Sequence, residues 1–170
     1  VNAQNSGLYP QIINVNNRAN ISLEGKWKTI VDPFENGYYD YRLSPLKKGY
    51  FADQDYTDKT KLQEYNFSTD KSLMVPGDWN TQRPELYYYE GTVWYRKRFN
   101  VNAIESDKRL FLYFGAVNYE AKVYLNGTLI ATHVGGFTPF NIEVTDKLKT
   151  GQNSLVVKVD NKRKLNAVPT

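Results

Sequence analysis

The sequence predicts an all-β fold, a β-sandwich of the jelly-roll type, on three observations. Short runs of alternating apolar and polar residues begin at residue 21 and are separated by turn residues, which is the pattern of half-buried strands. Helical periodicity is nearly absent. Aromatic residues make up 15% of the 170 positions, and their rings favour pleated surfaces over helices. About seven or eight such runs at this spacing indicate a sandwich whose edges are shortened by loops.

The composition narrows the class of protein further. A hydrophobic content of 41% is enough to close a single core, so the sequence predicts one domain. The 22 basic and 18 acidic residues are intermixed and leave a net charge of only +4, which disfavours nucleic acid as a partner. No apolar run is long enough to span a bilayer, so no membrane partner is predicted. The chain has no cysteine, which excludes disulfides and thiolate metal sites.

The first predicted strands end at proline. Run 23–31 stops at Asp32-Pro33 and run 72–75 stops at Pro76-Gly77, because proline lacks the N–H that a strand ladder needs. Run 92–101 alternates so that one face, expected to lie in the core, carries Val93, Tyr95, Phe99 and Val101. The other face, expected to be a decorated surface, carries Thr92, Trp94, Arg96 and Arg98.

The later part of the chain contains the strongest hairpin signal. Run 121–125 leads into Asn126-Gly127, two residues that tolerate the positive φ angles of a tight hairpin turn. A two-residue hairpin would place Leu125 opposite Thr128 and Val123 opposite Ile130. Further strands are expected around 110–114, 140–144 and 155–159. The predicted core includes Trp27, Leu112, Val123, Leu125, Val157 and Val159.

The expected organisation has three parts. An N-terminal arm covers 1–20, the sandwich covers 21–160, and 161–170 is expected to start a linker to a missing next domain. Within the sandwich, residues 34–70 are polar and tyrosine-rich without clear periodicity. This stretch is too long for an ordinary connection, so we predict a long insertion there.

Residues for catalysis or metal binding are scarce. The single histidine, His133, cannot build a His-rich zinc site, and we expect it to be structural, hydrogen-bonded beside Gly135-Gly136. The stretch 53–58 has a faint calcium-loop spacing but lacks the glycine and the closing glutamate of an EF-hand. Acids in predicted loops are interpreted as solvated surface charges: Asp53, Asp55, Asp58, Glu85 and Glu90. The sequence therefore predicts no catalytic residue, metal or cofactor in this chain.

One loop does suggest contact with a ligand. Residues 78–91 are dense in aromatic, carboxylate, amide and guanidinium side chains. Tyrosine and tryptophan rings pack against the C–H faces of a pyranose, while polar side chains bind its hydroxyls. The alternative is that these aromatics pack against a neighbouring domain, and composition alone does not separate the two.

Five ordered blocks resemble the N-terminal domain of family 2 β-glycosidases, above all the bacterial β-glucuronidases. They are Val75-Pro-Gly-Asp-Trp-Asn80, Tyr89-Glu-Gly-Thr-Val-Trp-Tyr-Arg96, Leu112-Tyr-Phe-Gly-Ala-Val-Asn-Tyr-Glu120, Val123-Tyr-Leu-Asn-Gly127 and His133-Val-Gly-Gly-Phe-Thr-Pro-Phe140. The resemblance implies a galactose-binding-domain-like jelly roll, followed by an immunoglobulin-like domain and a (β/α)₈ barrel. It also implies that the two catalytic glutamates of a retaining mechanism belong to the barrel. The chain alone is therefore expected to be inactive.

The resemblance also points to a site. In related β-galactosidases the loop after the Val-Pro block reaches the pocket of the barrel, and the corresponding loop here is 78–91. The substrate-proximal candidates within it are Asp78, Trp79, Asn80, Arg83, Tyr89 and Glu90. The implied partners are a β-glycoside carbohydrate in the context of the full enzyme, with glucuronides favoured, and the following domains of the same chain. A homo-oligomeric parent is compatible with the family.

Family habit and the polar N-terminal arm favour a periplasmic or secreted parent, with the cytoplasm left open. Two other functions stay open as well. One is a stand-alone carbohydrate-binding or lectin-like module, and the other is a scaffold or oligomerisation domain without a ligand.

Overall fold

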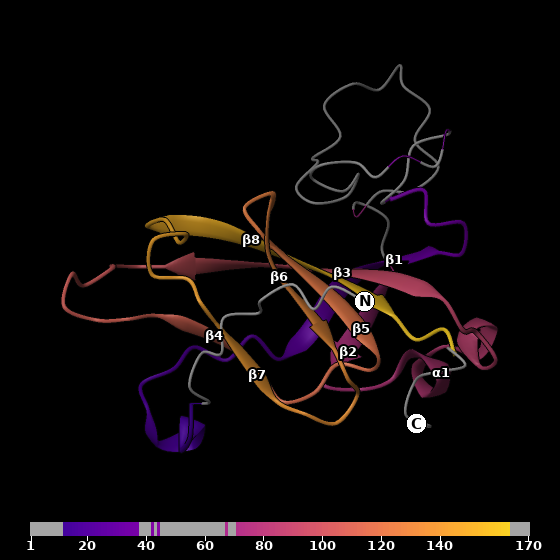
Figure 1. Ribbon diagram of the computed structural model, residues 1–170, viewed down its shortest axis with the longest axis horizontal. Helices are drawn as coiled ribbons and strands as arrows, with labels where there is room; N and C mark the ends of the chain where they lie inside the picture. Colours follow the sequence, from indigo (N-terminus) through magenta and orange to yellow (C-terminus); the bar gives the residue numbers. More distant parts are fainter. Residues whose placement is uncertain (1–11, 38–41, 43, 45–66, 68–70, 164–170) are drawn as a thin grey trace.

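The computed structural model describes residues 12–37, 42, 44, 67 and 71–163. In this part of the chain the strands form two antiparallel sheets (Figure 1), which confirms the predicted all-β class. The predicted insertion at 34–70 and linker at 161–170 lie largely outside the described residues, as do the first part of the arm and the 53–58 stretch. Among the helices in the described ranges, none has the length and apolar character to cross a membrane.

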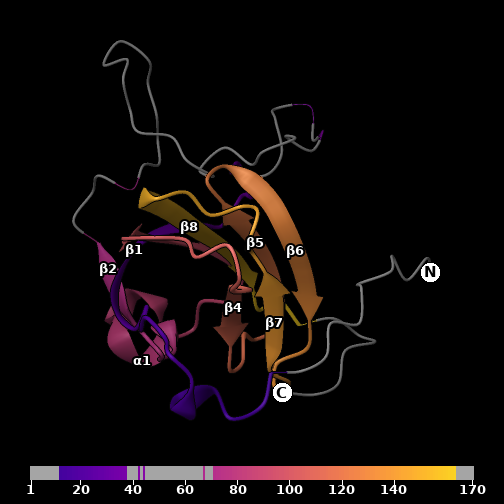
Figure 2. The same cartoon turned by 90° about the vertical axis from the view of Figure 1, so that its left-hand side faces the viewer.

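The larger sheet has six strands in the order β2-β1-β3-β8-β5-β6, and the smaller sheet pairs β4 with β7. The strands of the larger sheet are β1 (Gly25–Asp32), β2 (Ser72–Val75), β3 (Thr92–Val101), β5 (Glu120–Leu125), β6 (Thr128–Val134) and β8 (Gly151–Asp160). The smaller sheet consists of β4 (Phe111–Phe114) and β7 (Phe140–Glu143). Within the described ranges, three short helices accompany them: η1 (Val15–Asn17), α1 (Trp79–Gln82) and η2 (Pro84–Leu86). Figure 2 shows β4 and β7 on one side of the larger sheet.

The main core lies between the two sheets. It combines Trp27 and Val123 from the larger sheet with Leu112 and Ile142 from the smaller one. All the residues predicted for the core are buried: Trp27, Leu112, Val123, Leu125, Val157 and Val159. The alternation of apolar residues along the strands therefore predicted the correct parity for this side of the sheet.

The hairpin between β5 and β6 forms where the Asn-Gly pair predicted it. Asn126 and Gly127 have φ angles of 50° and 81°, which is the left-handed region that the turn requires. Leu125 lies opposite Thr128 as predicted, but Val123 lies opposite Ala131 and not Ile130. The register shifts between Val123 and Tyr124, because a β-bulge inserts one extra residue into β6. The turn residues determine the pairing only up to this bulge.

The second face of β3 is only in part the decorated surface that the sequence predicts, because Arg98 is exposed but Thr92 and Trp94 are buried. Trp94 has no exposed surface at all and belongs to a second buried cluster. Its ring lies 5.9 Å from that of Tyr124, and Phe67 joins the same cluster. Phe67 comes from the predicted insertion, so a distant segment covers this face. The six-stranded sheet is therefore buried on both sides at this point, and Trp94 is not available as a docking surface.

Shortening Leu112 to alanine should destabilise the fold by about 2–5 kcal/mol, through lost transfer energy and the cavity left behind. Leu112 is buried between the sheets, on the strand β4 that pairs with β7. Chemical denaturation would measure the loss. The matched control is Tyr113→Ala on the same strand, whose side chain is exposed and whose change should cost less than about 0.5 kcal/mol. Equal midpoints for Leu112→Ala and the unchanged chain would contradict the packing described here.

Candidate functional site

The loop 78–91 has a defined internal structure. Asp78 caps α1 by accepting hydrogen bonds from the backbone N–H (2.8 Å) and the hydroxyl (2.9 Å) of Thr81. These hydrogen bonds hold the pKa of the Asp78 carboxyl below its usual value. At the other end of α1, Arg83 forms an ion pair with Glu85, with 2.6 Å between Nη2 and Oε1. The predicted loop thus contains one turn of α-helix followed by the 3₁₀ helix η2.

Asn80 and Trp79 hold the second half of the loop against the first. The Asn80 side-chain amide donates to the carbonyls of Leu86 (2.6 Å), Tyr87 (3.1 Å) and Tyr89 (3.3 Å). The buried indole of Trp79 also donates to the Tyr89 carbonyl, at 3.2 Å. Backbone carbonyls that would otherwise need water are satisfied within the loop, so its shape does not depend on a ligand.

The loop is also fixed to the edge of the larger sheet. The Gln82 side chain accepts a hydrogen bond from the Met74 N–H (2.6 Å) and donates one to the Met74 carbonyl (3.0 Å). Its amide thereby binds the outer side of β2 in the way that a neighbouring strand would. This contact ties the end of α1 to the sheet.

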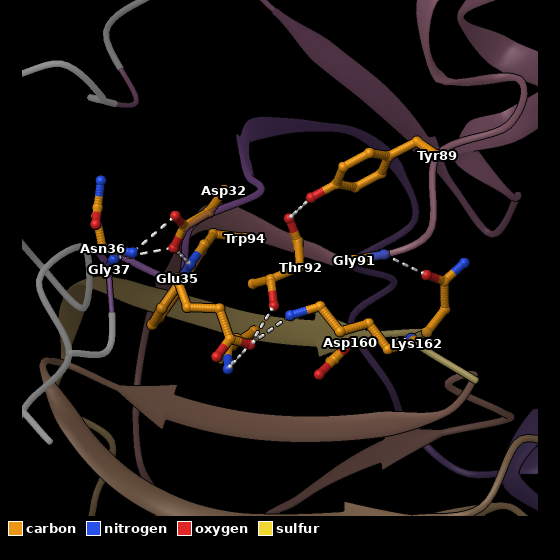
Figure 3. A network of polar contacts seen from close by, with 12 residues as sticks. Asp32, Glu35, Asn36, Gly37, Tyr89, Gly91, Thr92, Trp94, Asp160 and Lys162 are labelled. Carbon is orange, nitrogen blue, oxygen red and sulfur yellow. Dashed lines mark hydrogen bonds and ion pairs between the residues drawn. The ribbon is translucent and has the colours of Figure 1, made fainter. Parts of the chain in front are cut away.

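At its far end the loop closes on β3. The Tyr89 hydroxyl donates to the Thr92 carbonyl at 2.9 Å (Figure 3). The Tyr89 ring lies so close to Gly91 that an added Cβ there would meet its hydroxyl at 2.5 Å, so any larger residue would displace the ring. Glu90 forms an ion pair with Arg163 at 2.9 Å. Each of the six predicted site residues is thus placed, and each has a partner within the chain.

The exposed aromatic side chains of the loop are two that the prediction did not select, although Asp78 and Glu90 of the selected residues are exposed as well. Tyr88 is 90% exposed and Tyr87 is 60% exposed, and their rings meet edge to face at 4.7 Å. Both follow η2, on a segment whose carbonyls are held by Asn80. The loop therefore presents a pair of aromatic rings on a rigid support.

A polar network lies at the end of the sheet where the loop joins β3 (Figure 3). The Asp32 carboxylate, with no exposed surface, accepts hydrogen bonds from the N–H groups of Asn36 and Gly37 and from the Trp94 indole, all at 2.9 Å. Glu35 has a φ of 56° and accepts from the Thr92 hydroxyl at 3.0 Å. Asp32 therefore shapes the turn that aims Glu35 at β3.

Glu35 also meets two lysines of the last strand and its continuation. The Lys158 Nζ lies 3.3 Å from Glu35 Oε1, and the Lys162 Nζ lies 3.4 Å from it. Burial alone would raise the pKa of Glu35, but the two ammonium groups and the Thr92 hydroxyl outweigh burial and hold it below its ordinary value. Sequence reasoning missed this network. The available signal was the Asp-Pro-x-Glu-Asn-Gly stretch at 32–37, whose residue types build side-chain-to-backbone turns.

The lowered pKa of Glu35 makes stability depend on pH in a defined direction. The folded state favours the ionised carboxylate, so its contribution is present above the ordinary pKa of 4.5 and is lost as the pH falls through and below that value. We expect Glu35→Gln to lower the denaturation midpoint at pH 7 and to have a shrinking effect below about pH 4.5. A matched control is Glu105→Gln, which changes an exposed carboxylate paired with Lys108. A midpoint difference for Glu35→Gln that is constant from pH 7 to pH 3 would contradict the assignment.

The other sequence predictions for this region can be placed as well. The His133 Nε2–H donates a hydrogen bond to the Gly135 carbonyl at 3.1 Å, and the ring stacks on Phe140 at 4.1 Å, which confirms the predicted contact beside Gly135-Gly136. Burial holds its pKa below the ordinary value. Over residues 12–37 and 71–163, His, Asp and Glu side chains form no group of three that could hold a metal ion.

A family profile described as "Glycosyl hydrolase 2 galactose-binding domain-like" matches residues 76–167, more than half of the chain. The chain belongs to this family. The matched range contains the loop, β3 to β8 and the segment that carries Lys162. It begins just after β2, so the Asp32 and Glu35 turn lies outside the part that the family profile describes.

Relatives of this glycosyl hydrolase 2 galactose-binding domain-like chain carry hydrolase names. It is 36% identical over 89 residues to a beta-galactosidase of Thermoanaerobacter pseudethanolicus, covering 49% of the chain and 12% of that protein. It is 35% identical over 92 residues to a beta-glucuronidase of Streptococcus agalactiae, covering 51% and 15%. The chain thus spans well under a fifth of these curated relatives.

Solved structures give the same result for the fold. A Bifidobacterium dentium beta-glucuronidase, in complex with coumarin-3-O-glucuronide, superposes with a TM-score of 0.67 and 32% identity. The superposition covers 90% of this chain and 22% of the other. The family 2 resemblance predicted from the five sequence blocks is confirmed, and the chain is a domain of the kind found in β-glucuronidase-like glycoside hydrolases.

Proposed function

We propose that this domain is the non-catalytic, N-terminal sugar-binding domain of a retaining β-glycosidase, and that its loop 78–91 helps to shape an active site formed by a downstream barrel. The favoured substrates are β-glucuronides. The names of the relatives and the small share of their length that the chain covers support this proposal.

One observation carries the proposal. Most of the candidate side chains of the loop are engaged within the chain: Trp79 lies in the core, Asn80 and Tyr89 donate to backbone carbonyls and Asp78 caps α1. Arg83 and Glu90 form ion pairs, of which that of the exposed Glu90 is weak. A self-sufficient sugar site needs convergent polar groups that are free to bind hydroxyls. The aromatic rings that the loop offers outward are those of Tyr87 and Tyr88. A rigid loop with exposed rings suits a surface that the rest of an enzyme completes.

The first test concerns catalysis by the chain alone. We expect no turnover of chromogenic β-glucuronides or β-galactosides, because the retaining mechanism requires a pair of converging carboxyl groups. Turnover that copurifies with the chain and disappears when one of its own acids is changed to the amide would overturn the proposal. Sequencing the gene beyond Thr170 adds an independent check, since the proposal requires a barrel with two glutamates downstream.

The second test uses the full-length gene product. Tyr88→Ala should lower kcat/KM for an aryl β-glucuronide by about 2- to 10-fold, the usual worth of one aromatic contact. Tyr113→Ala, which removes another exposed tyrosine outside the loop, is the matched control and should leave kcat/KM unchanged. If Tyr88→Ala also leaves it unchanged, the loop has no part in the active site.

Calorimetry with glucuronate or galactose on the chain alone distinguishes the proposed function from its leading alternative. Weak or absent binding is expected. Tight binding that Tyr88→Ala abolishes would instead favour a stand-alone lectin-like module. Export of the parent stays a prediction, which activity measured in periplasmic and cytosolic fractions would test.

A further inference from the structure

Glu35 lies where three segments of the chain meet. It sits in the turn after β1, and its carboxylate accepts from Thr92 at the start of β3 (Figure 3). It also pairs with Lys158 near the end of β8. The buried Asp32 carboxylate holds this turn in place by accepting hydrogen bonds from its backbone. The position of Glu35 is therefore set by the fold and not by its own side-chain flexibility.

The segment that follows β8 is tied to the end of the loop. We call residues 160–163 the exit segment. Asn161 and Gly91 exchange two hydrogen bonds, one from the Gly91 N–H to the Asn161 side chain (2.8 Å) and one from the Asn161 N–H to the Gly91 carbonyl (3.2 Å). Lys162 reaches Glu35, and Arg163 reaches Glu90. The exit segment thus runs beside residues 90 and 91.

These contacts differ in how well they are shielded from water. The side chains of Arg163 and Lys162 are 85% and 44% exposed, so their ion pairs are screened and individually weak. Lys158 and Glu35, in contrast, are only 7% and 22% exposed. A partly buried pair that also receives the Thr92 hydroxyl resists opening more than the exposed pairs do. Glu35 is the group that links the shielded lysine on β8 to the exposed lysine beyond it.

From this arrangement we infer that Glu35 is a positioning residue, which clasps the exit segment against the end of the loop 78–91. Without its carboxylate, Lys162 loses its partner across the gap and Lys158 loses a neutralising charge at the end of β8. The contact of the exit segment with residues 90 and 91 then rests on the two hydrogen bonds of Gly91 and Asn161 and on the exposed ion pair of Arg163 with Glu90. The consequence for the enzyme rests on the proposed function: the clasp fixes the direction in which the chain leaves the domain relative to Tyr87 and Tyr88.

Limited trypsin digestion of the full chain tests the clasp, because Lys162 and Arg163 are themselves cleavage sites. Glu35→Gln keeps the shape of the side chain and removes its charge. We expect cleavage after Lys162 or Arg163 to become roughly 5- to 30-fold faster than in the unchanged chain, the factor that corresponds to losing a charge-assisted contact. Cleavage after the exposed Lys108 serves as the internal reference, measured by mass spectrometry in the same digest.

Two controls separate clasping from general stability. Leu112→Ala weakens the whole fold but leaves the clasp intact, so it should not raise the rate at 162–163 relative to the rate at Lys108. Glu24→Gln removes an exposed charge from the segment before β1 and should change neither rate. If Glu35→Gln proves unable to fold, Thr92→Val removes only the hydroxyl contact and should still favour cleavage at 162–163.

Equal relative rates for Glu35→Gln and the unchanged chain would overturn the inference. So would equal acceleration at 162–163 and at Lys108, which would make Glu35 a stabilising residue only. The digest needs no enzyme activity, so a failure of the clasp is distinguishable from a failure of the proposed function. In the full-length enzyme, a clasp that also serves the active site should make Glu35→Gln change KM or kcat for an aryl β-glucuronide, whereas Glu24→Gln changes neither.

Discussion

Replacing Asp32 by alanine should destabilise the domain by about 3–5 kcal/mol, which is at the upper end for single substitutions. Asp32 is completely buried and satisfies the N–H groups of Asn36 and Gly37 and the Trp94 indole. Alanine leaves the buried Gly37 N–H and Trp94 indole, and the partly buried Asn36 N–H, without this acceptor and opens a space beside Trp94. The free energy of unfolding from urea titration measures the loss.

The asparagine variant provides the matched control for this prediction. Asp32→Asn keeps the size and one oxygen but replaces the second acceptor by an N–H₂ group that faces a donor. It should therefore fall between the unchanged chain and Asp32→Ala. A loss below about 1 kcal/mol for Asp32→Ala would mean that water replaces the carboxylate and that the interior of the turn at 32–37 is open to solvent.

Trp79→Ala should cost about 3–5 kcal/mol, although Trp79 is one of the predicted site residues. Its ring is buried in the main core, 6.2 Å from the ring of Tyr89 and 6.5 Å from that of Tyr95. The change removes this packing and the hydrogen bond to the Tyr89 carbonyl, so the second half of the loop loses its support. Thermal or chemical unfolding would show the effect directly.

The size of this effect decides which variant can test function. Any loss of activity or sugar binding in Trp79→Ala would follow from the damaged loop, whereas Tyr88→Ala removes an exposed ring and should leave stability within about 0.5 kcal/mol. Trp79→Phe, which keeps an aromatic ring, should recover most of the stability. A Trp79→Ala chain as stable as the original would mean that the indole is not part of the core.

Local signals in the sequence predicted the strands well because their physical causes are local. The positive φ angles at Asn126 and Gly127 depend on those two residues, and the turn formed as expected. The register beyond Tyr124 depends on a bulge that no residue type in the hairpin predicts, so the predicted partner of Val123 was wrong. The face of Trp94 was misjudged because its cover, Phe67, comes from a segment without periodicity.

In the candidate site, too, local features were predictable from the sequence and long-range contacts were not. Composition located the loop 78–91, but it could not tell which of its side chains are used internally, since that depends on carbonyls six to nine residues away in the case of Asn80. Glu35 and Lys158 are 123 positions apart, and only the strand order brings them together. Asp78, Trp79, Asn80, Arg83, Tyr89 and Glu90 stay predictions as substrate-proximal residues.

The contact between Gln82 and Met74 has a consequence for solubility. β2 is the outermost strand on one side of the larger sheet, and an open strand edge is a template on which a second molecule can add a strand. The Gln82 amide already occupies both hydrogen-bonding groups of Met74 on that edge. The end of α1 therefore blocks strand addition at Met74 on the β2 edge, so a change that loosens the loop should also expose this edge to pairing with a second molecule.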